Sequence, residues 1–100
     1  IMIHSRQKSP AEVIEFAKFH KSEFPDIPLI CVPSSFNEIT ADELADAGFN
    51  VVIYANQLMR ASYKAMNETA MGILENNRTL EVEEKLISIK EILKLIPGTE

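Results

Sequence analysis

Three short apolar runs, each followed by polar residues, divide the first half of the chain. They occupy residues 1–3, 29–32 and 51–55, and a segment with helical spacing follows each one. The run at 29–32 lacks the alternation of a half-exposed strand, which predicts a strand covered on both faces. The order β-α-β-α-β-α predicts an α/β fold with three parallel strands. Sites in such sheets lie at the carboxyl ends of the strands.

Capping signals predict where the helices begin and end. Ser or Thr followed three residues later by Glu, the capping-box pattern, occurs at 9–12, 40–43 and 88–91. Gly48 stands where a left-handed helix end is expected. In the first helix, His20 is expected on the surface.

The longest predicted helix covers residues 58–76, and a short turn or helix is expected at 80–86. One apolar stripe runs along the long helix at helical spacing. Small and apolar residues beside the stripe predict that this helix is covered on more than one side. A core role for its methionines is favoured over an adaptable interface.

Composition narrows the classes of function. The 100 residues suffice for one domain, and the chain begins directly with a strand, so we expect a piece of a larger α/β domain. A net charge of -5 with scattered basic residues argues against nucleic-acid binding. No apolar run has the length of a membrane span. The single cysteine, Cys31, lies in an apolar strand and is expected in the core, and a cytoplasmic location is expected.

Polar side chains that could carry chemistry follow the three predicted strands. His4 ends the first strand, where imidazole can hold an anion or move a proton, and Ser5 could donate to the same anion. Ser34, Ser35 and Asn56 follow the other two strands and could converge on the same place. A structural role for His4, and helix capping by the Ser and Asn side chains, are the alternatives.

The sequence gives little support for a metal site or a phosphate loop within the chain. Asp42 and Glu43 are explained by a favourable charge at a helix start, and the acidic run at 81–84 is typical of a solvated surface. Cysteine and histidine lack zinc-site spacing, and the three glycines are well separated.

Four segments resemble the C-terminal part of the phosphoenolpyruvate mutase family, within the isocitrate lyase superfamily. They are Ile-Met-Ile-His-Ser at 1–5, Val-Pro-Ser-Ser-Phe at 32–36, Val-Ile-Tyr-Ala-Asn at 52–56, and the stretch 89–95. Gln57 stands where the family commonly has His, and Ser34-Ser35-Phe36 stands where Thr-Thr-Tyr is frequent.

The resemblance implies that residues 1–98 are strands six to eight of a (β/α)8 TIM-type barrel with their following helices, and that 99–100 are a tail. It implies an isomerase of phosphonate biosynthesis that interconverts phosphoenolpyruvate and phosphonopyruvate with Mg²⁺. His4 would help an arginine of an earlier strand to hold the phosphoryl group, with Ser5 as a second contact. The metal ligands would belong to earlier strands, outside this chain.

Other consequences of the resemblance concern partners and alternatives. The substrate would be a small phosphorylated or phosphonylated 2-oxo acid, and the helix at 58–76 would be exchanged between barrels of a homo-oligomer. A phosphonopyruvate hydrolase or a carbon-carbon lyase of the same superfamily is the alternative among enzymes. We expect the isolated segment to be inactive, and the alternative of another class is a non-catalytic structural or oligomerisation module.

Overall fold

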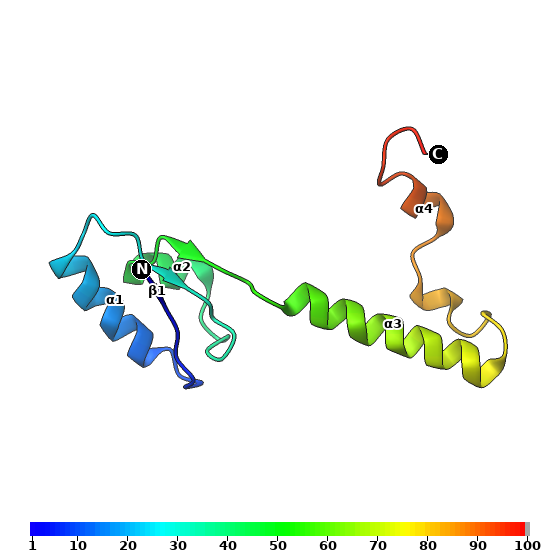
Figure 1. The fold of residues 1–100 in the computed structure, drawn as a ribbon, viewed down its shortest axis with the longest axis horizontal. Coiled ribbons are helices and arrows are strands. Elements are labelled where there is room, and N and C mark those ends of the chain that lie inside the picture. Colours follow the sequence, from blue (N-terminus) through cyan, green and yellow to red (C-terminus); the bar gives the residue numbers. More distant parts are fainter. Residues whose placement is uncertain (100) are drawn as a thin grey trace. The chain divides into compact units, whose positions relative to one another are not determined.

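The chain forms short strands and helices that belong to two compact units, Ile1–Gln57 and a second that begins at Leu58 (Figure 1). The computed structural model describes residues 1–99. In chain order the elements are β1 (Met2–Ile3), α1 (Ala11–Glu23), β2 (Ile30–Cys31), α2 (Ala41–Ala47), β3 (Val51–Val52), α3 (Gln57–Asn76), the 3₁₀ helix η1 (Glu83–Lys85) and α4 (Ile89–Leu93).

The three strands form one parallel sheet in the order β1-β2-β3, as the apolar runs predict. Ile30 of β2 pairs with Met2 on one side and with Val51 on the other. The regular strands are shorter than predicted, but the hydrogen bonds continue beyond them. The Ile53 N–H, for example, donates to the Cys31 carbonyl at 2.9 Å. The α/β class with three parallel strands is therefore confirmed.

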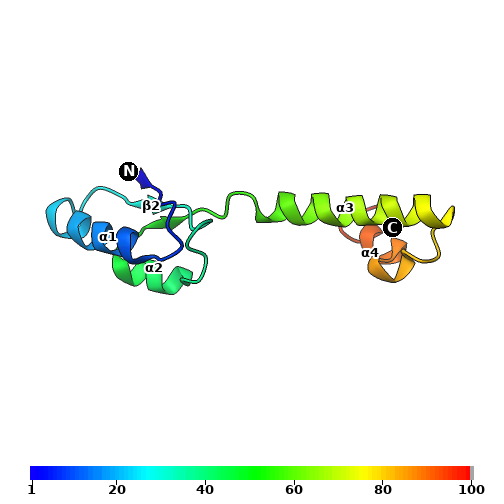
Figure 2. The same ribbon diagram turned by 90° about the horizontal axis from the view of Figure 1, so that it is seen from below.

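Both helices of the first unit lie on the same side of the sheet (Figure 2). Leu29 and Cys31 are fully buried against Val13 and Ala17 of α1 and Leu44 of α2, in one apolar core. This confirms Cys31 as a core residue, and burial raises the pKa of its thiol. The core fixes β2, the middle strand, against both helices.

The prediction that β2 is covered on both faces is wrong for the described residues. Ile30 is only partly buried, and its neighbours Met2 and Val51 are 64% and 45% exposed. The physical reason is that α1 and α2 contact each other and return to one face, so neither is left for the other face.

Two of the three predicted capping boxes form. Thr40 with Glu43, and Ser88 with Glu91, make the reciprocal side-chain and backbone hydrogen bonds. The box predicted at 9–12 is wrong, because Glu12 accepts a hydrogen bond from Ser5 instead. Gly48 ends α2 in the left-handed region at φ 119°, as predicted.

The expectation that His20 lies on the surface is also wrong. Only 4% of the residue is exposed, and the ring lies between Phe16 and Phe24, with centroids 6.0 and 5.9 Å away. Its Nε2 is 2.8 Å from the Ile27 carbonyl oxygen. The two aromatic neighbours and the loop after α1 together enclose a side chain that helical spacing alone leaves exposed.

In the second unit, the segment after α3 folds back alongside the helix (Figure 1). Val82, which is 5% exposed, packs so closely on Gly72 that a Cβ at that position would lie 2.5 Å from Val82 Cγ1. No residue of α3 is buried, so the predicted cover on more than one side is absent from residues 58–99. The 3₁₀ helix η1 confirms the short turn predicted at 80–86. Within residues 1–99, no helix is both long and apolar enough to cross a membrane.

Replacing Leu44 by Ala is expected to destabilise the first unit by about 2–5 kcal/mol, because it leaves a cavity in a fully buried core. Urea unfolding followed by circular dichroism measures the change. Leu58→Ala is the chemically matched control, since that side chain is 86% exposed and its loss is expected to change stability by less than about 0.5 kcal/mol. Equal effects of the two variants would contradict the assigned core.

The capping box of α2 predicts a pH dependence. The Thr40 backbone N–H and the Thr40 hydroxyl both donate to the Glu43 carboxylate, which lowers the pKa of Glu43 below its ordinary value. The stabilisation is therefore present above the unfolded-state pKa and is lost as the pH falls through the folded-state pKa. Thr40→Ala is expected to raise the pKa of Glu43 and to lose about 1 kcal/mol of stability at neutral pH.

An NMR titration of the Glu43 side-chain carbons in acid measures that pKa. Thr40→Ser keeps the hydroxyl and is expected to leave the titration close to that of the unaltered chain. A Glu43 titration that is the same in Thr40→Ala and Thr40→Ser would show that the hydroxyl does not hold the carboxylate.

Candidate functional site

His4 lies at the carboxyl end of β1, directly after Ile3, and is exposed. Its ring centroid is 6.4 Å from that of Phe36, with the planes tilted by 41°. Phe36 follows β2 and is fully buried in the core. The structure therefore brings the ends of β1 and β2 together through a histidine that remains accessible and an aromatic ring that is fixed. The assigned role of His4 stays a prediction.

Ser5 is buried, with 5% of its surface exposed, and its hydroxyl is used twice. It donates to Glu12 Oε2 at 2.5 Å and accepts from the backbone N–H of Gln7 at 3.1 Å. Donation to an anion would require the bond to Glu12 to open. The contact of Ser5 with substrate stays a prediction. In the structure the Ser5 hydroxyl has a partner within its own loop, the Gln7 backbone N–H.

Ser34, Ser35 and Asn56 do not cap the helices that follow them, so the capping alternative is wrong for these side chains. Thr40 caps α2, and the described chain holds no hydrogen-bond partner for Asn56 Oδ1, which is buried. The Asn56 backbone N–H donates to Gln57 Oε1 at 3.2 Å. The contact of the His4 ring in the described residues is with Phe36 and not with these side chains, so their convergence on one point stays a prediction.

Residues 1–99 contain no group of three or more His, Cys, Asp or Glu side chains that could hold a metal ion. The acid that shares a pocket with His4 is Glu12, and Ile3, Val13 and Phe16 complete this pocket of about 220 Å³. A single carboxylate that already accepts a hydrogen bond does not make a magnesium site. The prediction that the metal ligands belong to earlier strands, outside this chain, stays a prediction.

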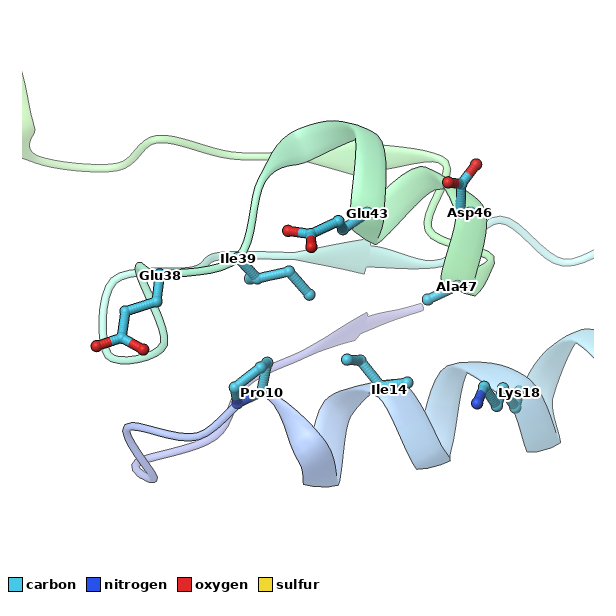
Figure 3. Close-up of a pocket in the computed structure, with 8 residues that line it drawn as sticks. All are labelled: Pro10, Ile14, Lys18, Glu38, Ile39, Glu43, Asp46 and Ala47. Carbon is cyan, nitrogen blue, oxygen red and sulfur yellow. The ribbon is translucent and has the colours of Figure 1, made fainter.

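A second pocket, of about 420 Å³, lies between α1 and α2 and contains none of the predicted site residues. Figure 3 shows its lining, in which Ile14 and Ile39 are apolar and Lys18, Glu43 and Asp46 are charged. It is a groove between two helices, and Pro10, Glu38 and Ile39 of the loops after β1 and β2 complete its lining. Among the described residues, its carboxylates, Glu38, Glu43 and Asp46, are not grouped so that they could hold a metal ion together.

Sequence reasoning missed two residues of the site, Phe36 and Glu12. Phe36 reads as a connection residue, and only the fold brings it onto the His4 ring. Glu12 stands three residues after Ser9, which is the capping-box spacing, so the local sequence predicts Ser9 as its hydrogen-bond partner. The signal that could have found the true partner is the proximity of a strand end to the first turn of the next helix in a βα unit.

The Asn56 side chain offers a test of its buried Oδ1, which has no hydrogen-bond partner among the described residues. Removing an unsatisfied buried acceptor costs no hydrogen bond, so Asn56→Ala is expected to change the free energy of unfolding by less than about 0.5 kcal/mol or to raise it. Asn50 is the matched control, because its Oδ1 accepts from the buried Leu29 N–H at 2.9 Å. Asn50→Ala is expected to cost about 1–3 kcal/mol in urea unfolding. A larger loss for Asn56→Ala than for Asn50→Ala would contradict this assignment.

Comparison with known proteins places this geometry in a family. The family model described as phosphoenolpyruvate phosphomutase matches residues 1–74. The phosphoenolpyruvate phosphomutase of Tetrahymena pyriformis is 37% identical over 95 residues, which are 95% of this chain and 31% of that protein.

Two solved structures are similar as well. The phosphoenolpyruvate phosphomutase of Streptomyces platensis subsp. rosaceus superposes with a TM-score of 0.83 at 32% identity, over 94% of this chain and 32% of that one. Phosphonopyruvate hydrolase in complex with oxalate and Mg²⁺ superposes with a TM-score of 0.79 at 36% identity, over 95% and 33%. The chain thus spans about a third of the length of these relatives. Because the family model covers most of its residues, the chain belongs to the phosphoenolpyruvate phosphomutase family.

Proposed function

We propose that residues 1–98 form strands six to eight of a (β/α)8 barrel with their following helices, and that residues 99–100 are a tail. The one-sided packing of the sheet supports this proposal. In such a barrel the helices cover the outer face of the strands, and side chains of all eight strands fill the interior. Met2, Ile30 and Val51, on the uncovered face, would then belong to the barrel interior.

We propose that the whole enzyme is a phosphoenolpyruvate phosphomutase-type isomerase of phosphonate biosynthesis, which converts phosphoenolpyruvate into phosphonopyruvate. The observation that carries the proposal is an accessible imidazole, His4, at the carboxyl end of a strand within the segment that the family model matches. Active sites of (β/α)8 enzymes lie at this end of the strands. The substrate class is a small phosphorylated or phosphonylated 2-oxo acid.

In this proposal His4 donates a hydrogen bond from a ring nitrogen to an oxygen of the phosphoryl group. A donor aimed at the transferring group stabilises the negative charge on its oxygens, and it does so best when its position is fixed in advance. The contact with the buried Phe36 ring supports such a fixed position. Ser5 is the second proposed contact, reached when its bond to Glu12 opens.

We propose that the enzyme uses Mg²⁺ bound by residues outside this chain. The hydrolase relative was solved with oxalate and Mg²⁺, whereas the acids in residues 1–99 do not fit a magnesium site. When bound, the ion would neutralise charge on the phosphoryl and carboxylate oxygens. We further propose a cytoplasmic location, where an unpaired cysteine such as Cys31 stays reduced.

A homo-oligomer formed through α3 completes the proposal. Leu58, Met59, Tyr63 and Met66 of this helix are between 65% and 86% exposed. A run of exposed apolar side chains on one helix is typical of an interface. The isolated chain would then be inactive and depend on the rest of the barrel for the reaction.

Two alternatives have support of their own. The similarity to phosphonopyruvate hydrolase, at 36% identity, favours hydrolysis of phosphonopyruvate to pyruvate and phosphate, and a carbon-carbon lyase of the same superfamily is a further candidate. The exposed apolar surface of α3 favours a non-catalytic assembly module.

An assay of the full-length protein that carries this chain, supplied with phosphonopyruvate and Mg²⁺, separates the enzymatic readings. Phosphoenolpyruvate as the product supports the isomerase, and pyruvate with free phosphate supports the hydrolase. His4→Ala is expected to lower kcat by about 10²-fold or more, because it removes a donor to the reacting group. Asp46→Asn, on the groove between α1 and α2, is the control and is expected to keep full activity.

Sedimentation of the isolated chain addresses the module reading. One outcome would contradict the isomerase proposal and support the non-catalytic assembly module. In that outcome the isolated chain is an inert oligomer and the full-length protein turns over none of the family's substrates.

A further inference from the structure

The loop between β1 and α1 contains one buried polar side chain. Gln7 and Lys8 are exposed, whereas Ser5 is 5% exposed and connects two elements through its hydroxyl. It accepts from the Gln7 backbone N–H and donates to Glu12 in the first turn of α1. The hydroxyl therefore fixes the turn of the chain that follows His4.

Glu12 is used in an unusual way for an acid at a helix start. The sequence offers it Ser9 as a capping partner, but its carboxylate accepts from Ser5 at 2.5 Å. A hydrogen bond to an ionised carboxylate is about twice as strong as one between neutral groups. The helix that carries Glu12 is in turn anchored in the core by Val13 and Ala17, which are 2% and 0% exposed.

His4 is consequently held from two sides. On one side its ring lies against Phe36, which is fixed in the core. On the other side the next residue, Ser5, is tied to Glu12, and His4 and Glu12 line the same pocket. Both contacts are anchored in the buried apolar core, because Phe36 follows β2 and Glu12 belongs to α1.

We propose that the Ser5–Glu12 hydrogen bond sets the orientation of His4, which makes Glu12 and Ser5 positioning residues for the phosphoryl-binding imidazole; this role rests on the proposed function. A reacting group displaced by about 1 Å can lose about 10²-fold in rate. In this proposal a carboxylate in the first turn of α1 acts on the imidazole through Ser5.

The first test is NMR spectroscopy of the isotopically labelled chain. Ser5→Ala and Glu12→Ala break the hydrogen bond, whereas Ser5→Thr and Glu12→Gln keep a donor and an acceptor. The readouts are the nuclear Overhauser effect between the His4 and Phe36 rings and the chemical shifts of the His4 ring. His20, the other of the two histidines, is the internal reference for folding, because its ring is enclosed elsewhere in the unit.

We expect both Ala variants to lose most of the His4–Phe36 signal while the His20 signals stay in place. Ser5→Thr and Glu12→Gln are expected to restore it, and Glu15→Gln, an exposed acid on the same helix, to leave it unchanged. If Ser5→Ala unfolds the unit, the His20 signals move too, and the comparison of Glu12→Gln with Glu12→Ala decides. Unchanged His4 signals in folded Glu12→Ala would overturn the proposal.

The second test uses the full-length protein with phosphonopyruvate. Ser5→Ala and Glu12→Ala are expected to lower kcat/KM by about 10- to 100-fold, and the Thr and Gln variants to recover most of it. The two proposals fail separately. An unaltered protein without turnover, but with the NMR response, removes the proposed function and keeps the positioning role. Turnover with full activity in both Ala variants removes the positioning role and keeps the function.

Discussion

The packing of β2 against α1 and α2 is the constraint on which the first unit depends. Leu29, Cys31 and Leu44 have no exposed surface, and full burial of an apolar side chain stabilises a fold by about 1.5–3 kcal/mol. Phe36 belongs to the same core and also contacts the ring of His4. The core and the candidate site therefore share Phe36, so a change in core packing acts directly on the ring that contacts His4.

The helices α1 and α2 cover one face of the sheet and leave the other face uncovered. Met2, Ile30 and Val51 are neighbours across three strands and face away from the core. Parallel sheets are stable when both faces are covered, because their strands are apolar on both sides. The continuous apolar run at 29–32 therefore indicates that a second layer covers the other face of the sheet. Residues 1–99 do not provide that layer. Together with relatives about three times as long, this supports the proposed barrel.

Features governed by local chemistry were predictable from the sequence. The boxes at Thr40 and Ser88 and the left-handed end at Gly48 need only residues within one helical turn. The parallel order followed from apolar runs separated by helical segments. These elements suffice to place His4 at the carboxyl ends of the strands. The contact of His4 with Phe36 could not be predicted from the sequence, because it depends on how two loops meet.

Features decided by tertiary contacts escaped prediction. The capping box expected at 9–12 does not form, because Glu12 accepts a hydrogen bond from the Ser5 hydroxyl, seven residues earlier. The strand end that carries Ser5 lies beside the first turn of the helix. His20 was enclosed by Phe16, Phe24 and the loop after α1, which helical periodicity does not describe. Asn56 follows a strand where capping is the usual role, and its buried Oδ1 lacks a partner among the described residues.

A difference in burial explains why the adjacent residues His4 and Ser5 take different roles. Ser5 is buried, with 5% of its surface exposed, whereas its neighbour His4 is exposed and lines a pocket with Ile3 and Glu12. Ile3 packs against the core beneath α1, and Ser5 bonds Glu12 of the same helix. His4 stays accessible instead. This geometry supports a division of roles in which the accessible imidazole meets the anion, while the hydroxyl holds the loop and reaches the anion only when its bond to Glu12 opens.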